Sequence, residues 1–571
     1  MKHPIIIPAP NEAVLQEEVS VPLAHTIRID PALASFAPVL EDRLSKIGEH
    51  HVTVADVSSG ATITWRHVDG GSWDDEEYDL SINGGGITIT ASTRTGVSHA
   101  LTTLWQIVAS NGDDGLPVIA VHDKPRFAWR GLSLDVCRHF FPVEDIKAVI
   151  EQCALLKMNR FHWPLSDDQG YRIESKKFPE LNNISSWRKL EACDPLIAQG
   201  ERIGAVYGGY YTYEQIRDVV DYARQRGITV IPELEVPGHV TAILAAHPEL
   251  SCSGESVQVS GRFGVHKRIL CAGKDQTLDF VCALIDEIAE LFDTPYIHLG
   301  GDEAPKDEWK QCSACNTRME QVGAASWDEL QSWFCEQVVE HVKSLGKTAI
   351  TWNEATIGGR LDTTALVQYW TEMAPGPSYM IPEIERGRRI ISSSMNSFYC
   401  DYSYADIPLR GTLMYEPEVK GNRVPEQCAY GIEGTMWTEW TSEFTQVEHL
   451  LYPRLLAIAE CGWSHHRNSE EFLQRAEQFL SEPMVNVLEP MPWEQATIHG
   501  DEALKAIVAN MIQLGQRYAS SGGGEAVMPE DAVPVDPKLM MRMFMESKMR
   551  GAYSSDDIDK VVEMLSSSMH R

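Results

Sequence analysis

The sequence predicts an α/β protein in which a (β/α)8 TIM barrel follows a small α+β domain and precedes a helical C-terminal extension. Two observations predict this. Eight short apolar runs recur between residues 131 and 437, with amphipathic helical patterns between several of them. The preceding residues instead alternate short β-rich runs with polar turns. We therefore expect domains at 1–122, 123–470 and 471–571.

The N-terminal domain is predicted from three β-rich stretches and one helix. Leu101, Leu104, Trp105 and Val108 recur at helical spacing, which indicates a helix with one apolar face. The segment KPRFAWRG, 124–131, marks the boundary with the next domain. The stretches are HTIRID (25–30), HVTVADV (51–57), GITITAS (86–92) and the helical VSHALTTLWQIVAS (97–110).

The barrel prediction depends on the apolar runs, each of which is typical of a buried strand. Clear helical patterns occupy 143–157, 213–227, 277–292 and 327–347, and TQVEHLLYPRLLAIAECGW (445–463) predicts one final helix. The pattern is weak between strands six and seven, and only a long loop is expected between seven and eight. The predicted strands are 131–136, 160–165, 229–234, 296–300, 348–352, 366–370, 389–394 and 431–437.

The C-terminal extension is predicted to contain a linker and two helices. Residues 520–537 have the Gly- and Pro-rich composition of a linker. Residues 537–550 and 554–569 have helical patterns, the second with an N-cap cluster. Their Met-rich faces are typical of packing surfaces. They would suit docking on the barrel or pairing with a second subunit in a possible homodimer.

The composition narrows the partners and the location. A formal charge of −33 argues against nucleic acid or an anionic membrane as partner and suits a neutral substrate. The apolar core of MKHPIIIPAPNEA is too short for a signal peptide, and no run is long enough to span a membrane. We therefore expect a cytoplasmic protein with reduced cysteines.

The cysteines raise the question of a metal. Cys312 and Cys315 form a C-x-x-C pair, and Cys252 and Cys271 lie upstream, so zinc could bind there. A single C-x-x-C pair is a weak signal. The expectation is therefore a protein that needs no metal and no cofactor.

Chemically active residues follow every predicted strand, and the carboxyl ends of barrel strands meet at one rim. Any one of them has an ordinary structural explanation, but eight sets on one rim are hard to explain by packing. The tryptophans could stack on a sugar ring, and no glycine-rich phosphate loop follows a strand, which favours a glycan over a nucleotide. In strand order they are Asp135 and Arg138, Asp167 and Asp168, Glu235 and His239, Asp302 and Glu303, Trp352, Trp370, Tyr399 and Asp401, and Trp437 and Glu439.

Seven motifs resemble glycoside hydrolase family 20, the β-N-acetylhexosaminidases. They follow the order of that family from about residue 127 to 463, and HLGGDE together with WTE is highly specific. The N-terminal segment resembles the small α+β domain that often precedes that barrel. The motifs are RGLSLDVCRHF, KMNRFHWPLSDDQGYRIES, IPELEVPGH, IHLGGDE, TWNEA, YCDYSY and GTMWTE.

The resemblance implies an exo-acting, retaining enzyme in which the 2-acetamido oxygen of the substrate attacks the anomeric carbon and forms an oxazolinium ion. Glu303 matches the acid that protonates the leaving oxygen. Asp302 matches the group that orients the acetamido group and stabilises its positive charge. We expect an ionised Asp302 to keep Glu303 protonated.

Further roles follow from the resemblance, residue by residue. Arg138 would bind the hydroxyls at C3 and C4, and Asp401 and Glu439 the side of C4 and C6. Tyr399 would donate to the acetamido carbonyl. The remaining residues are Trp352, Trp370 and Trp437, which would enclose the sugar, and Asp167 and His239, which would form a polar network behind the acid.

The chain departs from the family pattern at two positions. Pro164 stands where the family usually has histidine, which predicts a local change at the end of strand two. Glu235 stands where the family usually has aspartate, so its contacts should shift by one methylene.

Three alternatives remain open. A metal-dependent barrel hydrolase would use His162, His239, Asp135 and Asp302 as ligands. A glycan-binding protein would use the same rim without cleavage, although binding alone would not require the Asp302–Glu303 pair. A member specialised for a disaccharide unit or a modified sugar is the third.

Overall fold

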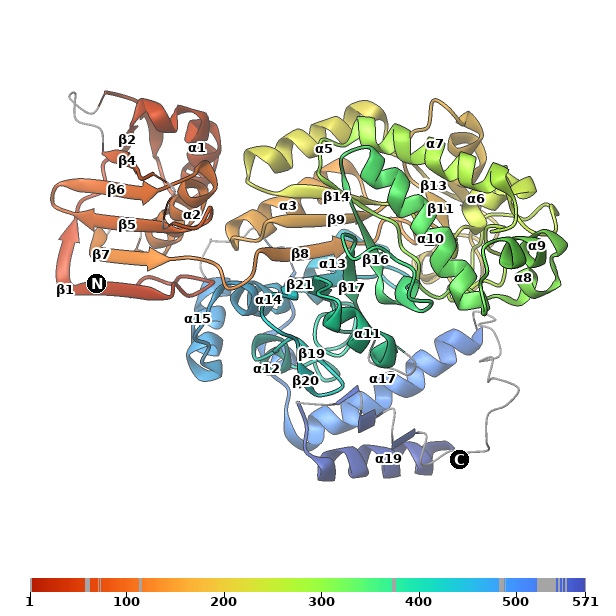
Figure 1. Ribbon diagram of the computed structural model, residues 1–571. Coiled ribbons are helices and arrows are strands. Elements are labelled where there is room, and N and C mark those ends of the chain that lie inside the picture. Colours follow the sequence, from red (N-terminus) through yellow and green to blue (C-terminus); the bar gives the residue numbers. More distant parts are fainter. Residues whose placement is uncertain are drawn as a thin grey trace.

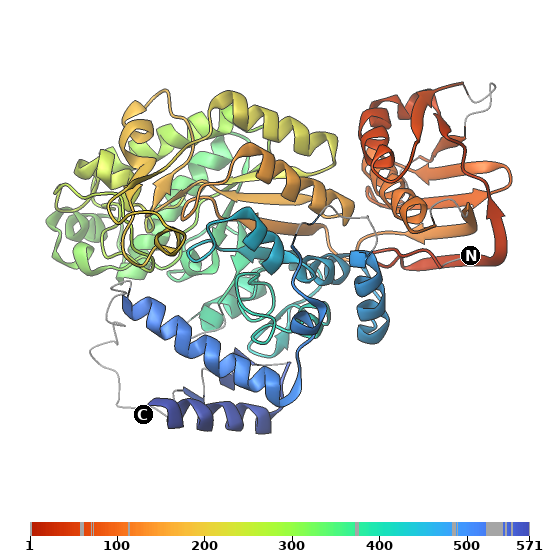
Figure 2. The ribbon, with the colours of Figure 1, turned by 180° about the vertical axis from the view of Figure 1, so that it is seen from behind.

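The computed structural model describes residues 3–56, 62–69, 71, 73–111, 115–371, 376–481, 487, 489–520, 541–542, 545–546, 548–549 and 552–569. The N-terminal domain lies beside a central barrel, and the C-terminal helices lie along another side of it (Figures 1 and 2). The predicted fold class is confirmed.

The N-terminal domain is a seven-stranded mixed sheet with the strand order β1-β7-β5-β6-β4-β2-β3. Helix α2 (Arg94–Asn111) is buried along most of its length, because it packs on β5 and β6 and its Gln106 donates to the carbonyl of Leu155 in the barrel. A second helix, α1, spans Ala37–Ser45. The strands are β1 (Glu12–Val21), β2 (Thr26–Ile29), β3 (His51–Val54), β4 (Ile63–His67), β5 (Tyr78–Asn83), β6 (Gly86–Ala91) and β7 (Leu116–Asp123).

A buried ion pair joins this domain to the barrel. Lys157 Nζ lies 3.0 Å from Asp123 Oδ2, and both side chains are fully buried. Tyr78 and Trp463 donate further hydrogen bonds to the same carboxylate oxygen. A buried pair with its hydrogen bonds satisfied fixes the position of one element against another, because separating the charges would leave them unsolvated.

The barrel closes in the order β14-β15-β16-β17-β18-β21-β8-β9, and every neighbouring pair is parallel. Each strand lies within or overlaps one of the predicted apolar runs. Their carboxyl ends therefore share one rim. The strands are β8 (Trp129–Leu134), β9 (Arg160–Pro164), β14 (Thr229–Glu233), β15 (Tyr296–His298), β16 (Thr348–Trp352), β17 (Leu366–Tyr369), β18 (Ile390–Ser392) and β21 (Ala429–Met436).

The outer helices agree with the prediction in four places and differ in two. The predicted final helix is wrong as a single element: it is two helices, because Pro453 has no N–H to continue the first. Between strands seven and eight, the expected loop contains the short helix α12 (Leu409–Leu413) and the hairpin of β19 (Glu418–Val419) and β20 (Asn422–Arg423). The others are α3 (Val143–Leu155), α5 (Tyr213–Gln225), α7 (Asp275–Leu291), α10 (Trp327–Ser344), α11 (Gly376–Glu385), α13 (Phe444–Leu451) and α14 (Arg454–Trp463).

The C-terminal extension docks on the barrel. Helices α15 (Ser469–Ser481), α16 (Trp493–Ala496), α17 (Gly500–Ser520) and α19 (Ser555–Met569) follow the barrel in sequence. Met545 and Met549 lie in a small apolar core with residues of α17, α19 and Ala405 of the barrel loop. Of the two expected roles of the Met-rich faces, docking is therefore the one observed. Most of the predicted linker, 521–537, lies outside the described residues.

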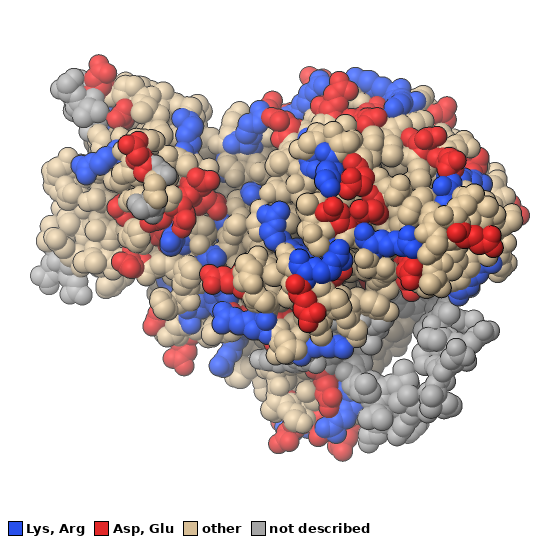
Figure 3. Space-filling model, viewed as in Figure 1, with Lys and Arg blue, Asp and Glu red and all other residues tan. Residues whose placement is uncertain are grey.

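The acidic surplus is not gathered on the face seen in Figure 3, where Lys and Arg are interspersed with Asp and Glu. Within the described part of the chain, no helix combines the length and the apolar character needed to cross a membrane.

Candidate active site

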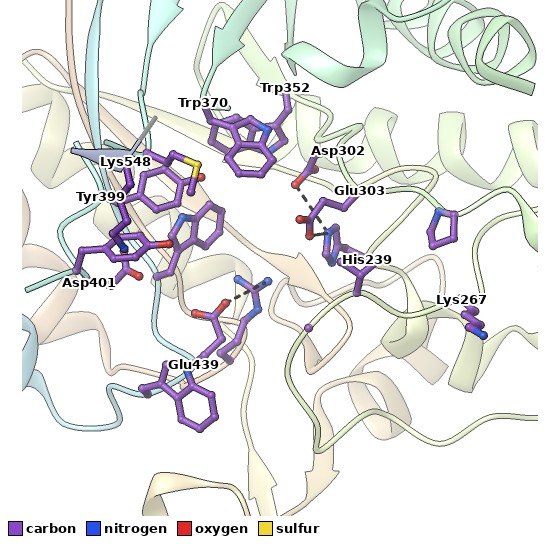
Figure 4. Close-up of a pocket in the computed structure, with 18 of the residues that line it drawn as sticks. His239, Lys267, Asp302, Glu303, Trp352, Trp370, Tyr399, Asp401, Glu439 and Lys548 are labelled. Carbon is purple, nitrogen blue, oxygen red and sulfur yellow. Dashed lines mark ion pairs between the residues drawn. The ribbon is translucent and has the colours of Figure 1, made fainter. Parts of the chain in front are cut away.

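A cavity of about 1440 Å³ opens at the carboxyl rim of the barrel. Asp302, Glu303 and His239 lie on one side of it, across from Tyr399 and Asp401 (Figure 4). Of the predicted site residues, Asp167 alone does not line this cavity; it lies behind Arg138 and His239. The predicted residues in the lining are Arg138, His239, Asp302, Glu303, Trp352, Trp370, Tyr399, Asp401, Trp437 and Glu439.

The backbone after β15 is shaped to present the two acids. Gly300, Gly301 and Glu303 all have positive φ, of 63°, 101° and 44°. A side chain at Gly300 would collide with Glu235, whose carboxylate accepts from the amide of Gly301. A positive φ at a non-glycine residue costs about 1–3 kcal/mol. The strained backbone directs the side chain of Glu303 into the cavity, where it is 37% exposed.

His239 lies between two pairs of acids. Its Nε2 is 3.6 Å from Glu303 and 3.8 Å from Asp302, and its Nδ1 is 3.1 Å from Asp168 and 3.5 Å from Asp167. Burial alone would lower the pKa of His239, but Asp167, Asp168 and Glu303 outweigh it and raise the pKa well above the ordinary value. The protonated ring of His239 thus offsets negative charge on the carboxyl groups around it.

The burial of Asp302 opposes the ionised form that the sequence analysis expects. Desolvation raises the pKa of Asp302 well above its ordinary value, although His239 acts in the opposite direction. Its Oδ1 is buried, and none of the described residues hydrogen-bonds to it. The nearby Glu354 and Glu303 raise the pKa further. Burial therefore favours a proton on Asp302, and a positively charged partner would be needed to stabilise its ionised form.

Glu354, from the motif TWNEA, supports the backbone of the acid. Its carboxylate accepts a hydrogen bond of 3.0 Å from the amide of Glu303. Burial, followed by the charge of Glu303, raises the pKa of Glu354 to about 7. No sequence signal assigned Glu354 a role, because its contact depends on the turn after β15.

Aromatic side chains form the walls. Trp370 and Tyr399 are stacked, with ring centroids 6.2 Å apart, and Trp437 lies 6.0 Å from Trp352. The indole nitrogens of Trp352 and Trp370 are buried, and no described residue accepts a hydrogen bond from them. The amide of Trp370 is held by Asn353. Rings fixed in this way suit the apolar faces of a sugar and an acetamido methyl group.

Charged side chains also line the cavity. Arg138 Nη2 lies 2.9 Å from Asp167 and 3.9 Å from Glu439. Its guanidinium also covers the Trp437 ring at 5.1 Å. Burial, followed by the charge of Glu439, raises the pKa of Asp401 to about 8. These groups can donate to and accept from several hydroxyls at once.

The C-terminal extension contributes residues that sequence reasoning did not assign to the site. Asn510, Met511, Gln513 and Lys548 line the cavity. Lys548 Nζ lies 3.5 Å from Asp406 and 4.2 Å from the centre of the Tyr402 ring. Figure 4 shows it near Tyr399 and Asp401. A Lys in a Met-rich helix carries no sequence signal of this kind.

The metal-dependent alternative is not supported by the geometry. His162 faces the barrel interior and contacts Glu433 and Glu233, while Asp135 pairs with Arg138 and accepts from Thr438. The possible metal-binding groups among the described residues do not bring together His162, His239, Asp135 and Asp302.

The two departures from the family pattern have different outcomes. The pairing of β9 with β14 is regular through Pro164, so the expected local change does not extend to strand register. Glu235 reaches the amide of Gly301 beneath the acid pair, and burial together with Asp302 raises its pKa well above the ordinary value.

Comparison with known sequences decides the family. Residues 127–466 match the model of "Glycosyl hydrolase family 20, catalytic domain", and residues 3–124 match that of "Glycosyl hydrolase family 20, domain 2". The chain belongs to glycoside hydrolase family 20. The family-20 catalytic domain thus contains all the predicted site residues.

Relatives and solved structures agree with this membership. A "Beta-hexosaminidase" of Porphyromonas gingivalis is 36% identical over 68% of this chain and 51% of its own length. A second "Beta-hexosaminidase", from Vibrio furnissii, is 34% identical over 68% of this chain and 65% of its own length. This chain therefore spans between half and two thirds of those relatives. The "GH20 Exo beta-N-Acetylglucosaminidase" of Vibrio harveyi, solved with N-acetylglucosamine, has a TM-score of 0.74, is 28% identical, and covers 85% of this chain and 77% of its own.

Proposed function

We propose that this family-20 chain is an exo-acting, retaining β-N-acetylhexosaminidase that removes terminal β-linked N-acetylglucosamine, N-acetylgalactosamine or both from glycans. One observation carries the proposal. Asp302 and Glu303 share contact with His239 at one side of a tryptophan-walled cavity. Binding a sugar would not require this strained pair of acids. The names of the relatives and of the structural neighbours support the same substrate class.

The residues fit a reaction in two steps. In the first, the acetamido carbonyl oxygen of the substrate attacks C1 while Glu303 gives its proton to the leaving oxygen, and the C1–oxygen bond breaks. In the second, water attacks C1 of the oxazolinium, the bond between C1 and the acetamido oxygen breaks, and the water gives its proton to the carboxylate of Glu303. The two displacements retain the configuration.

The burial of Asp302 gives it a role that changes during the reaction. The desolvated carboxyl of Asp302 favours its neutral form, so it must release its proton to solvent as the substrate binds. The acetamido N–H gains positive charge as the oxazolinium forms, and it supplies the hydrogen-bond donor that Asp302 otherwise lacks. An ionised Asp302 is then stabilised most strongly when that charge is greatest, and a contact of this kind accelerates the reaction.

A cytoplasmic location is proposed from the cysteines. None of the twelve forms a disulfide, even where two sulfurs lie less than 4 Å apart. Thiols persist in reducing compartments. Fractionation of cells that produce the chain, with activity measured in each fraction, tests the location.

The function is tested with three nitrophenyl substrates: the N-acetyl-β-glucosaminide, the N-acetyl-β-galactosaminide and the plain β-glucoside. We expect release from one or both N-acetyl substrates and about 10²-fold or more lower kcat/KM on the glucoside, because the glucoside lacks the internal nucleophile. Equal rates on the glucoside would contradict substrate assistance. No release from any of them would contradict hydrolysis of simple N-acetylhexosaminides.

Asp401 gives a pH-dependent prediction for binding. Its pKa of about 8 means that it is neutral below that pH and becomes a charged acceptor above it. A hydroxyl bonds more strongly to the charged form, so the affinity for N-acetylglucosamine should rise about fivefold as the pH passes through that value. Inhibition constants of the wild type and of Asp401→Asn, measured from pH 6.5 to about 9.5, check this.

The ratio of the inhibition constant of the wild type to that of Asp401→Asn isolates the effect of Asp401, because other titrating groups such as His239 are present in both proteins. In Asp401→Asn the rise should disappear. A ratio that stays constant over the whole range would contradict the assignment.

A further inference from the structure

Four cysteines outside the active site converge on one point. They come from three places in the chain: Cys252, Cys271, and the pair Cys312 and Cys315. The sulfur of Cys271 lies 3.8 Å from that of Cys312 and 3.5 Å from that of Cys315, and Cys252 lies 3.7 Å from Cys315. All four sulfurs lie within 4.8 Å of one another.

These distances are those of a tetrahedron of thiolates around a metal ion. With a zinc–sulfur bond of about 2.3 Å, the edge of a regular tetrahedron is about 3.8 Å. A disulfide would bring two sulfurs to about 2.05 Å, so the observed separations belong to unbonded sulfurs. The arrangement therefore leaves room for one ion at its centre.

The backbone around the cluster is built to bring the sulfurs together. Gly273 lies so close to Ala314 and Cys315 that a Cβ would come within 2.2 Å of the carbonyl carbon of Ala314.

Two cations hold the same loops. Lys274 donates to the carbonyl of Ser251 at 2.6 Å, and Arg318 contacts the carbonyl of Gly273 at 3.5 Å. Each lies three residues after a cysteine of the cluster, Lys274 after Cys271 and Arg318 after Cys315. Arg318 also pairs with Asp275, so Lys274 is the cation that offsets part of the net negative charge that four thiolates and one divalent ion would carry.

We propose that Cys252, Cys271, Cys312 and Cys315 bind one structural zinc ion. This differs from the expectation of a metal-free chain, which rested on the weakness of a single C-x-x-C pair. A sulfur-only tetrahedron selects zinc or iron. Four protein ligands leave no open position for water or substrate, which is typical of structural zinc.

The ion would join two loops that carry site residues. Cys252 and Cys271 belong to the segment after β14, which also carries His239, whereas Cys312 lies between α8 (Asp307–Gln311) and α9 (Ser313–Gln321), shortly after Glu303. Trp309 already links the two by donating to the carbonyl of Leu270 at 2.8 Å. Helices α8 and α9 lie on the side of the barrel away from the N-terminal domain (Figures 1 and 2).

The first test measures metal in the full-length protein, purified without chelators from cells grown with zinc. We expect about one zinc per chain by plasma mass spectrometry. Replacement by Co²⁺ should produce thiolate-to-cobalt charge-transfer absorption and the d–d bands of a tetrahedral site. Alkylation should leave the four cysteines unmodified until the metal is removed.

The second test uses the double variant Cys312→Ser/Cys315→Ser with Cys282→Ser as the matched control, since Cys282 is a free cysteine of α7 outside the cluster. The double variant should lose the zinc, and the control should keep it. If the double variant fails to fold, the metal content and the cobalt spectra of the wild type still show whether the four cysteines bind zinc.

Four results would overturn the proposal. The first is wild-type protein without zinc whose four thiols all react with an alkylating reagent. The second is a pair of disulfides among the four residues, seen as a mass decrease of about four hydrogens without alkylation. The third is iron in place of zinc, which would overturn the identity of the metal. Equal zinc in the double variant and the control would place the ion elsewhere.

Discussion

Glu303→Gln is expected to lower kcat about 10²–10⁴-fold on a β-linked N-acetylglucosamine disaccharide, the range that general acid catalysis contributes. The amide has nearly the same shape as the carboxyl but has no proton to give to the leaving oxygen. A nitrophenolate departs without protonation, so the loss on the nitrophenyl substrate should be much smaller. Steady-state kinetics on both substrates measure the difference.

The control is Glu308→Gln, the same chemical change five residues further along. Glu308 pairs with Arg268 at 3.2 Å and does not line the cavity, so its kcat should stay close to that of the wild type. Affinity for N-acetylglucosamine should survive in both variants. If Glu303→Gln hydrolyses the disaccharide at nearly the wild-type rate, the acid is another group.

Asp302→Asn should lower kcat about 10²–10³-fold on N-acetylated substrates, a loss typical of removing one preorganised electrostatic contact. Asparagine can accept a hydrogen bond from the acetamido N–H but carries no charge to match the oxazolinium. Because burial already favours the neutral form of this carboxyl, the fold should tolerate the change. The melting temperature should therefore stay near that of the wild type or rise.

A thiazoline mimic of the oxazolinium separates this role from simple binding. The wild type should bind it much more tightly than N-acetylglucosamine, as transition-state-like ligands bind, and Asp302→Asn should lose most of that preference. Equal affinity of the wild type for the two ligands would refute the substrate-assisted reaction. An unchanged preference in the variant would assign the charge stabilisation to another residue.

The fold could be predicted because its signals are local. Eight apolar runs correspond to eight strands, since a strand buried on both faces is apolar throughout. The break at Pro453 was also readable, but helical periodicity on both sides concealed it. The sequence did not show which surface the C-terminal extension packs against, because an apolar helical face does not identify the surface that covers it.

The positions of the site residues followed from strand ends, whereas their electrostatics did not. The protonation of Asp302 depends on burial and on Glu354, which is distant in sequence. The choice between Asp167 and Asp168 as the nearer partner of His239 depends on a hairpin. The cysteine cluster unites residues up to 63 positions apart, so only the folded chain shows that four sulfurs meet.

The barrel and the C-terminal extension both line the cavity. The residues that cleave the bond and those that contact the rest of the substrate therefore belong to different parts of the chain. The groups around the anomeric carbon belong to strand ends that the barrel holds in place, whereas Met511 and Lys548 belong to helices that contact the barrel only at its surface. Mutations in the extension can therefore change which neighbouring sugar or substituent is accepted without disturbing the machinery of bond cleavage. A directed-evolution library confined to this region would explore selectivity at little risk to turnover.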